Sequence, residues 1–157
     1  MATALRPNWA LIVRQAVVAG FSGAVIFDLY LWLSTVVPVH GNTTAMFQHS
    51  ASIAIGPAAF TSPAYVWIGA LVDLVLSIGW AGGYAYFAQR QSFVNGRWFI
   101  SGFFYGLIVY VLMLLLQLGA RAFIYPANVG VLLNEVLART VFFGVPVAFV
   151  IAQMDRA

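Results

Sequence analysis

The chain has 157 residues, of which 63% are hydrophobic and 7% charged, and its mean hydropathy is +0.95; an average soluble protein carries about 25% charged residues, so lipid is the expected solvent. The formal net charge is +3, but all seven basic residues are arginines that form no run, which excludes a nucleic-acid surface. Cysteine is absent, which excludes disulfides and thiolate metal sites.

Four apolar stretches are long enough for a membrane crossing, which needs about 20 residues per helix. The predicted spans are residues 15–37, 63–87, 98–118 and 131–152. The sequence therefore predicts an all-α polytopic membrane protein, a four-helix transmembrane bundle that forms one domain over residues 1–157.

The first predicted span contains Asp28 and ends before Pro38. Its apolar stretch is longer than the 7–15 residues of a cleaved signal peptide, so we expect a retained anchor. The second span begins at Pro63, a residue suited to the first turn of a helix after a capping Ser62, and it contains Asp73.

The long connection between the first two spans has no formal charge and contains His40 and His49. Residues 43–55 are predicted to form a short interfacial or lid-like helix, because Gly56 and Pro57 interrupt any longer crossing. Its apolar side would hold Met46, Phe47, Ser50, Ile53 and Ala54. The two histidines are interpreted as surface residues of the outer loop, with a metal-binding or pH-sensing role as the alternative.

The third span carries Tyr110, and the fourth carries Glu135 and Arg139 at a spacing of four, which puts both on one helical face. Pro146 lies inside the fourth span, where a kink is expected. At a rise of about 1.5 Å per helical residue, Asp28, Asp73 and Arg139 each lie about 12–14 Å from the outer ends of their spans.

These depths predict a buried polar layer made of Asp28, Asp73, Glu135, Arg139 and Tyr110. Charges at membrane depth are normally paired, cavity-facing or functional. With three carboxylates and one guanidinium, full ionisation would give the layer a net charge of −2. Protons or a bound cation would have to balance this charge. The first interpretation of the layer is a structural network that holds the helices in register, and a proton- or cation-binding site is the alternative.

The other half of each span contains small residues four apart, a spacing that lets helices approach closely in lipid. The glycines predicted for helix packing are Gly20, Gly79, Gly83, Gly102, Gly106 and Gly144. This pattern predicts a bundle that is tight at one end and wider at the other, with a polar cavity capped by the long loop.

Orientation follows from the arginines, which are enriched on the cytoplasmic side of membrane proteins. Five fall on one predicted side, namely Arg6, Arg14, Arg90, Arg97 and Arg156. Only Arg121 falls on the other. Both termini are therefore predicted to be cytoplasmic.

The second and fourth spans resemble the YagU-like bacterial inner-membrane proteins. The run Trp67-Ile68-Gly69 with Asp73, Ser77, Ala81 and Gly83-Tyr84 is similar to that family's pattern, as are Glu135, Arg139 and Phe143. Asp73 and Arg139 stand where the family pattern has histidines, so a histidine site is not carried over. The resemblance implies a bacterial inner-membrane location and a polar layer, and no activity.

Two functions are compatible with these patterns. The first is a structural, accessory or subunit-like membrane protein, in which the polar layer stabilises the bundle. The second is a proton- or cation-coupled transporter that uses Asp28 and Asp73, with Arg139 as counter-charge and a homo-oligomer formed through Gly79 and Gly83. The sequence has no motif for an enzyme, a cofactor or a metal site.

Overall fold

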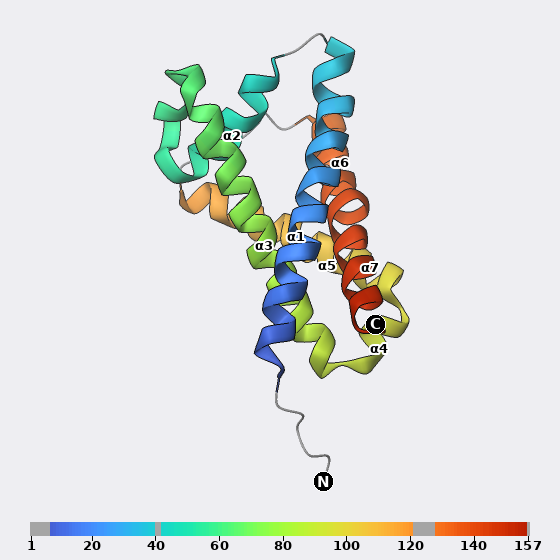
Figure 1. Ribbon diagram of the computed structural model, residues 1–157. Coiled ribbons are helices and arrows are strands. Elements are labelled where there is room, and N and C mark those ends of the chain that lie inside the picture. The colour runs from blue at the N-terminus through green and yellow to red at the C-terminus, as the bar shows by residue number, and fades with distance from the viewer. Residues whose placement is uncertain (1–6, 40–41, 121–127, 157) are drawn as a thin grey trace.

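The predicted all-α membrane fold is confirmed. The computed structural model describes residues 7–39, 42–120 and 128–156, and this part of the chain contains helices and no strand (Figure 1). Four helices in it are long and apolar enough to span a membrane, over Trp9–Val36, Pro63–Arg90, Trp98–Gly119 and Val129–Met154. The chain is therefore an integral membrane protein.

The first span begins earlier than predicted. Helix α1 (Trp9–Leu31) continues into a π-helical segment, η1 (Trp32–Val36). Its start is fixed by Asn8, whose side chain accepts a hydrogen bond from the Leu11 amide at 3.2 Å. Arg14, predicted to precede the span, lies inside α1 and is exposed; a long arginine side chain near a helix end can extend to the lipid headgroups.

The connection between the first two spans contains helix α2 (Thr43–Ile55), which covers the residues predicted for the short helix. Two 3₁₀ segments follow, η3 (Gly56–Phe60) and η4 (Pro63–Tyr65). The predicted apolar side is wrong in part, because Ala54 is exposed while Gln48, Ser50, Ala51 and Ser52 are buried. This side is polar because α2 packs against the second span, where the Ser50 hydroxyl donates a hydrogen bond to Asp73.

The second and third spans are regular helices joined by a short one. Helix α3 (Val66–Arg90) follows η4, where Ser62 caps the turn as predicted by accepting the Ala64 amide at 3.3 Å. Helix α4 (Ser92–Gly96) then leads into α5 (Trp98–Gly119).

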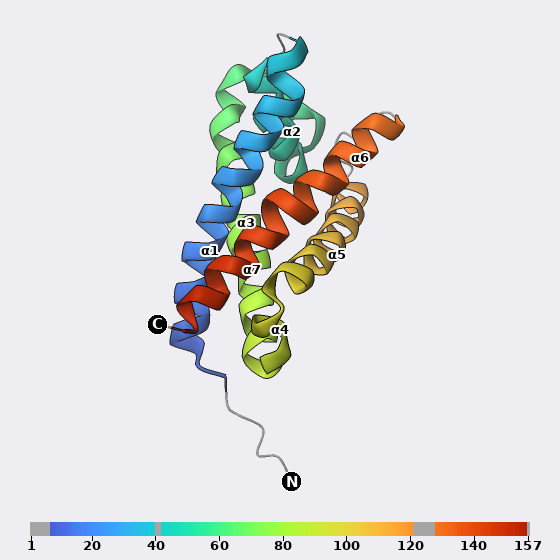
Figure 2. The same cartoon turned by 90° about the vertical axis from the view of Figure 1, so that its right-hand side faces the viewer.

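The fourth span consists of α6 (Val129–Leu137), the π-helical segment η5 (Ala138–Gly144) and α7 (Val145–Met154). Proline has no amide hydrogen, so Pro146 cannot donate to the preceding turn. The helix responds with π-helical turns just before Pro146, and Figure 2 shows the three segments following one another as a continuous rod.

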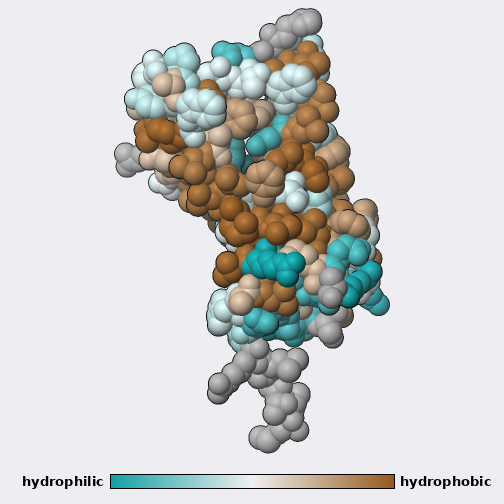
Figure 3. Space-filling model, viewed as in Figure 1, coloured by the Kyte–Doolittle hydropathy of each residue, from teal (hydrophilic) through white to brown (hydrophobic). Residues whose placement is uncertain are grey.

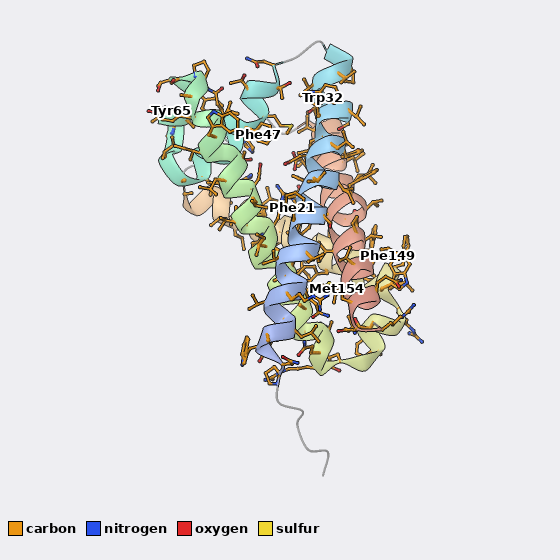
Figure 4. The ribbon with its side chains drawn as sticks, viewed as in Figure 1. Phe21, Trp32, Phe47, Tyr65, Phe149 and Met154 are labelled. Carbon is orange, nitrogen blue, oxygen red and sulfur yellow. The ribbon has the colours of Figure 1, made fainter. Side chains whose placement is uncertain are left out.

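Helix α1 packs against α3 on one side and against η5 and α7 on the other, and α5 packs against η5 and α7. The start of α1 and the end of α7 lie at one end of the molecule, here called the termini end, and α2 lies at the opposite end, the α2 end (Figure 1). Figure 4 shows Trp32, Phe47 and Tyr65 toward the α2 end, and Phe149 and Met154 toward the termini end.

Glycines hold the helices together in the middle and at the termini end. A Cβ on Gly20 would lie 2.6 Å from the Ile78 Cα, and one on Gly102 would lie 2.7 Å from the Gly144 carbonyl oxygen. A Cβ on Gly106 would collide with the Arg139 carbonyl. Such close backbone approach is typical of helix contacts in lipid.

Two of the predicted packing glycines lie elsewhere. Gly79 and Gly83 are exposed on α3, and nothing described lies within 4 Å of a Cβ on Gly79. They line a groove of about 600 Å³ between α3 and α5, near the termini end. The groove forms because α3 contacts α1 rather than α5 over most of its length.

Polar side chains join the helices at the termini end. Gln15 donates to Asp155 Oδ1 at 2.6 Å, and the hydroxyls of Tyr84 and Ser101 are 2.7 Å apart. The Tyr105 hydroxyl donates to the Trp80 carbonyl at 2.5 Å.

Large apolar side chains cover the outside of the bundle, as expected for a surface in contact with lipid (Figure 3). Exposed examples on the four spans are Val17, Phe21, Leu71, Val75, Phe104, Ile108, Leu115 and Leu133.

Gly106→Ala is expected to lower the free energy of unfolding by about 1–3 kcal/mol, because the new Cβ would push the Arg139 backbone away from α5. Denaturant titration in detergent measures the change. The matched control is Gly119→Ala on the same helix, whose Cβ enters open space and whose better helix propensity predicts a neutral or stabilising effect. Equal losses in the two variants would contradict the packing model.

Candidate functional site

The bundle encloses a cavity of about 540 Å³ in the half of the molecule that carries α2. Its walls come from α1, η1, α2, α3, α6 and η5, and its polar lining residues are Asp28, Ser34, Thr35, His49, Ser50, Asp73, Asn134, Glu135 and Arg139. The tight glycine contacts on the other side of Arg139 explain why the cavity lies in this half.

Arg139 is the cation that lines this cavity. Its Nε atom is 4.0 Å from Glu135 Oε2, one turn earlier on the same helix, and its guanidinium carbon is 4.5 Å from the centre of the Phe27 ring. The side chain of Arg139 is 13% exposed and that of Glu135 is 26% exposed. The guanidinium is therefore held by Glu135 and Phe27, where a cation–π contact stabilises it.

Asp73 of α3 receives a hydrogen bond from α2. The Ser50 hydroxyl donates to Asp73 Oδ2 at 2.6 Å, the length of a bond between a hydroxyl and a charged acceptor. Helix α2 comes close enough because position 69 of α3 is glycine, where a Cβ would collide with the Phe47 carbonyl. Gly69 thus brings the lining residues of α2 next to Asp73.

His49 connects α2 to the third span, where its Nε2 atom lies 3.2 Å from Gln117 Nε2. Burial lowers the pKa of His49 to about 4, and the positive charge of Arg139 acts in the same direction. The interpretation of His49 as a surface residue is wrong, because α2 turns it into the cavity. His40 lies outside the described residues.

A second polar connection links the first and fourth spans. The Tyr30 hydroxyl donates to Asn134 Oδ1 at 2.5 Å, and Asn134 Nδ2 donates to the Ser34 hydroxyl at 3.2 Å. The Tyr30 ring also stacks on Phe142, with the ring centres 3.9 Å apart. Asn134 therefore fixes α6 to α1 and η1 at the cavity wall.

Both π-helical segments contribute to the cavity. Segment η1 supplies Ser34 and Thr35, and η5 supplies Arg139. A π-helical turn rotates the side chains that follow it and is frequent at functional sites. The Thr35 hydroxyl donates to the Leu31 carbonyl at 2.6 Å, which satisfies a carbonyl in the widened turn.

The four charged residues predicted to lie together, Asp28, Asp73, Glu135 and Arg139, all line the one cavity. None of them is fully buried, so they surround a void and do not pack as a closed layer. Tyr110 does not line the cavity. The buried face of α5 carries Gly106, Val109, Met113 and Gln117, and Tyr110 is one residue beyond it.

Sequence reasoning missed Asn134, Gln117 and Ser50 as site residues. Asn134 directly precedes Glu135, and Gln117 is an amide inside a strongly apolar span, so both carried a recognisable signal. Ser50 carried none, because its contact with Asp73 depends on how α2 packs.

The cavity has three carboxylates and one guanidinium, while His49 is neutral above its lowered pKa. Full ionisation would leave an excess of two negative charges in a site that water reaches poorly. Among the described residues, no group of three or more histidine, aspartate or glutamate side chains is placed to hold a metal ion. The arrangement suits binding of a positively charged species that is not held as a metal centre.

Comparisons of the chain with protein-family models, with curated proteins and with solved structures find no match. The resemblance to the YagU-like proteins stays a prediction from its residues.

The lowered pKa of His49 predicts a pH dependence of stability. The unfolded chain binds this proton with the ordinary pKa of 6.5, so protonation favours unfolding. Relative to His49→Gln, the wild type should lose up to about 3 kcal/mol of unfolding free energy as the pH falls from about 6.5 to 4.

Denaturant titrations of both proteins in detergent at several pH values measure this difference. The glutamine variant keeps an amide near Gln117 and does not titrate, so the carboxylates contribute similarly to both proteins. A difference that is constant over this pH range would place His49 in water.

Proposed function

We propose that this protein binds a cation in the cavity at the α2 end and carries it across the membrane in exchange for protons, with Asp28 and Asp73 as the carboxylates that bind it. One observation carries the proposal. Asp28 Oδ1 is buried in the cavity wall and accepts no hydrogen bond from any described part of the chain, although the cavity contains an arginine.

The unpartnered carboxylate oxygen of Asp28 is energetically unfavourable. A buried carboxylate oxygen without a partner loses its hydration and gains nothing in return, which is costly at membrane depth. Arg139 would offset the cost if it bridged Asp28, but its guanidinium lies over Phe27 and beside Glu135. A proton or a cation in the cavity supplies the missing partner.

The two aspartates differ in their surroundings, and this difference supports a carrier. Asp73 already accepts a hydrogen bond from Ser50, whereas Asp28 Oδ1 faces no donor in the described chain. Both aspartates are acted on by the charge of Arg139. A cation that binds at Asp28 therefore competes with protons at that carboxylate.

Helix α2 is suited to control access to the cavity. It contributes Met46, His49 and Ser50 to the wall, and it is attached to the spans through Asp73 and Gln117. Opening of the α2 end would require release of these two polar contacts, of the bond from Trp32 to Thr43 and of the backbone contact at Gly69, and would leave the glycine contacts at the termini end in place. Transport then requires a second conformation in which the termini end opens.

We place the protein in a bacterial inner membrane with both termini in the cytoplasm, as the arginine distribution and the resemblance to the YagU-like proteins indicate. The cavity and α2 then face the outside. We also propose a homodimer in which α3 of each copy contacts the other through the exposed Gly79 and Gly83, whose spacing permits close approach in lipid.

A structural role is the second candidate. The bonds of Asn134 with Tyr30 and Ser34 join spans without any ligand, as does the bond between Ser50 and Asp73. In this case the polar side chains would stabilise an accessory or subunit-like protein, and their replacement would lower stability without affecting any transport.

Flux measurements separate the two candidates. Wild-type protein in liposomes that contain a pH-sensitive dye is expected to move protons when sodium, potassium or tetramethylammonium chloride is added outside. Asp28→Asn and Asp73→Asn should each reduce this flux at least tenfold while the protein remains folded, because a neutral amide removes the exchangeable charge.

The matched control is Asp155→Asn, the same change at a carboxylate of the termini end, where it contacts Gln15 and Asn95. This variant should retain flux. Circular dichroism and elution volume report folding for all variants. A wild type without flux, together with unfolded Asp28→Asn and Asp73→Asn variants, would overturn the carrier and support the structural role.

A further inference from the structure

We infer that the cation taken by this cavity is an organic ammonium ion with an apolar body. The inference rests on the cation-binding function proposed above and adds the chemical class of the ligand. Its basis is the combination of a large void, apolar walls and carboxylates on several of its sides.

The volume of the cavity fits a small organic molecule. Pockets for small organic molecules have volumes of about 300–1,000 Å³, and this cavity has about 540 Å³. A calcium ion, for example, is held by six to eight oxygen atoms at about 2.3–2.6 Å, which requires a tightly closed shell of ligands. The described carboxylates do not converge in that way, since no group of three or more is close enough to hold an ion.

The chemistry of the walls also favours an organic cation. Phe27, Leu31, Met46 and Val131 give the cavity an apolar surface. Burial of an apolar body against it contributes about 25 cal/mol per Å² of apolar area. A small inorganic cation would gain nothing from these side chains, whereas the hydrocarbon part of an amine would.

The carboxylates that could accept hydrogen bonds from an ammonium group reach the cavity from several helices. Asp28 comes from α1, Asp73 from α3 and Glu135 from α6, so carboxylates approach the void from three helices. An ammonium group has three N–H donors, and the unpartnered Asp28 Oδ1 can accept one of them. The cationic groups facing the void do not compete for them, because Arg139 is held by Glu135 and Phe27 and His49 is neutral near pH 7.

The surface of the molecule offers such a ligand an approach. Figure 3 shows hydrophilic atoms recessed between hydrophobic ones in the upper part of the molecule, beside α1 and α3. An amine with an apolar body concentrates at the membrane interface, with its charge toward water and its body toward lipid. It can therefore reach the cavity from a location where its local concentration is high.

The test is isothermal titration calorimetry on the full-length protein in detergent at pH 7.5 with three probes. Benzylammonium has both the charge and the apolar body, methylammonium has only the charge, and benzyl alcohol has only the body. Micelles without protein correct for partitioning. Benzylammonium is expected to bind at least tenfold more tightly than either of the other probes.

Variants locate the binding site. Asp28→Asn should weaken benzylammonium binding about 10- to 100-fold, the range expected when a hydrogen bond to a charged group is lost. Asp155→Asn should bind like the wild type. If Asp28→Asn fails to fold, the comparison of the three probes on the wild type decides alone.

Three results would overturn the inference: benzyl alcohol binding as tightly as benzylammonium, sodium chloride displacing benzylammonium at equal concentration, or equal affinities in the two variants. Sodium- or potassium-driven proton flux without benzylammonium binding would refute the ligand class and leave the carrier standing. Benzylammonium binding at Asp28 without flux of any cation would support the ligand class and refute the carrier.

Discussion

The backbone contact between Gly106 of α5 and Arg139 of η5 is the constraint on which the rest of the site depends. Any Cβ at position 106 would collide with the Arg139 carbonyl, so this one position lets the third and fourth spans touch at the level where the charge is placed. Toward the termini end, Gly102 and Gly144 continue the contact between these spans. Toward the α2 end, the cavity opens between the first, second and fourth spans and α2. A close-packed half and an open half thus result from the distribution of small residues along otherwise similar helices.

In lipid there is no water to form hydrogen bonds, so polar groups are expected to form them within the protein. Most polar side chains in the described part of this protein do so. Asn134, Ser50 and Tyr84 pair across helices. Among the described residues, Asp28 Oδ1 is one of several buried side-chain atoms without a hydrogen-bond partner, together with Gln15 Oε1 and Trp80 Nε1, and it is the one that belongs to a carboxylate of the cavity lining. Natural proteins retain such unfavourable arrangements mainly where they serve a function. The excess of carboxylates over guanidinium is therefore the strongest argument for a cation as ligand.

Helix α2 turns the cavity from a groove between spans into a covered site. It is attached through Gly69, Ser50 and His49, and each contact uses a different interaction: backbone proximity, a hydrogen bond to a carboxylate, and a contact between an imidazole and an amide. The last two are polar, so their strength responds to charge in the cavity. In the carrier proposed above, the helix that covers the site would link occupancy to access.

The sequence by itself determined the number of spans and the bounds of α2, because length and hydropathy are local properties. It also predicted that Asp28, Asp73 and Arg139 lie together, and the three residues line one cavity. Tertiary packing alone decided which faces meet. It turned His49 inward, left Gly79 and Gly83 exposed, and excluded Tyr110 from the cavity, since a helix shows several faces and only its neighbours select one. The shape and lining of the void beside Asp28 were decided by packing as well, because they depend on the relative positions of six segments, although the distribution of small residues along the spans already predicted a wider, polar end.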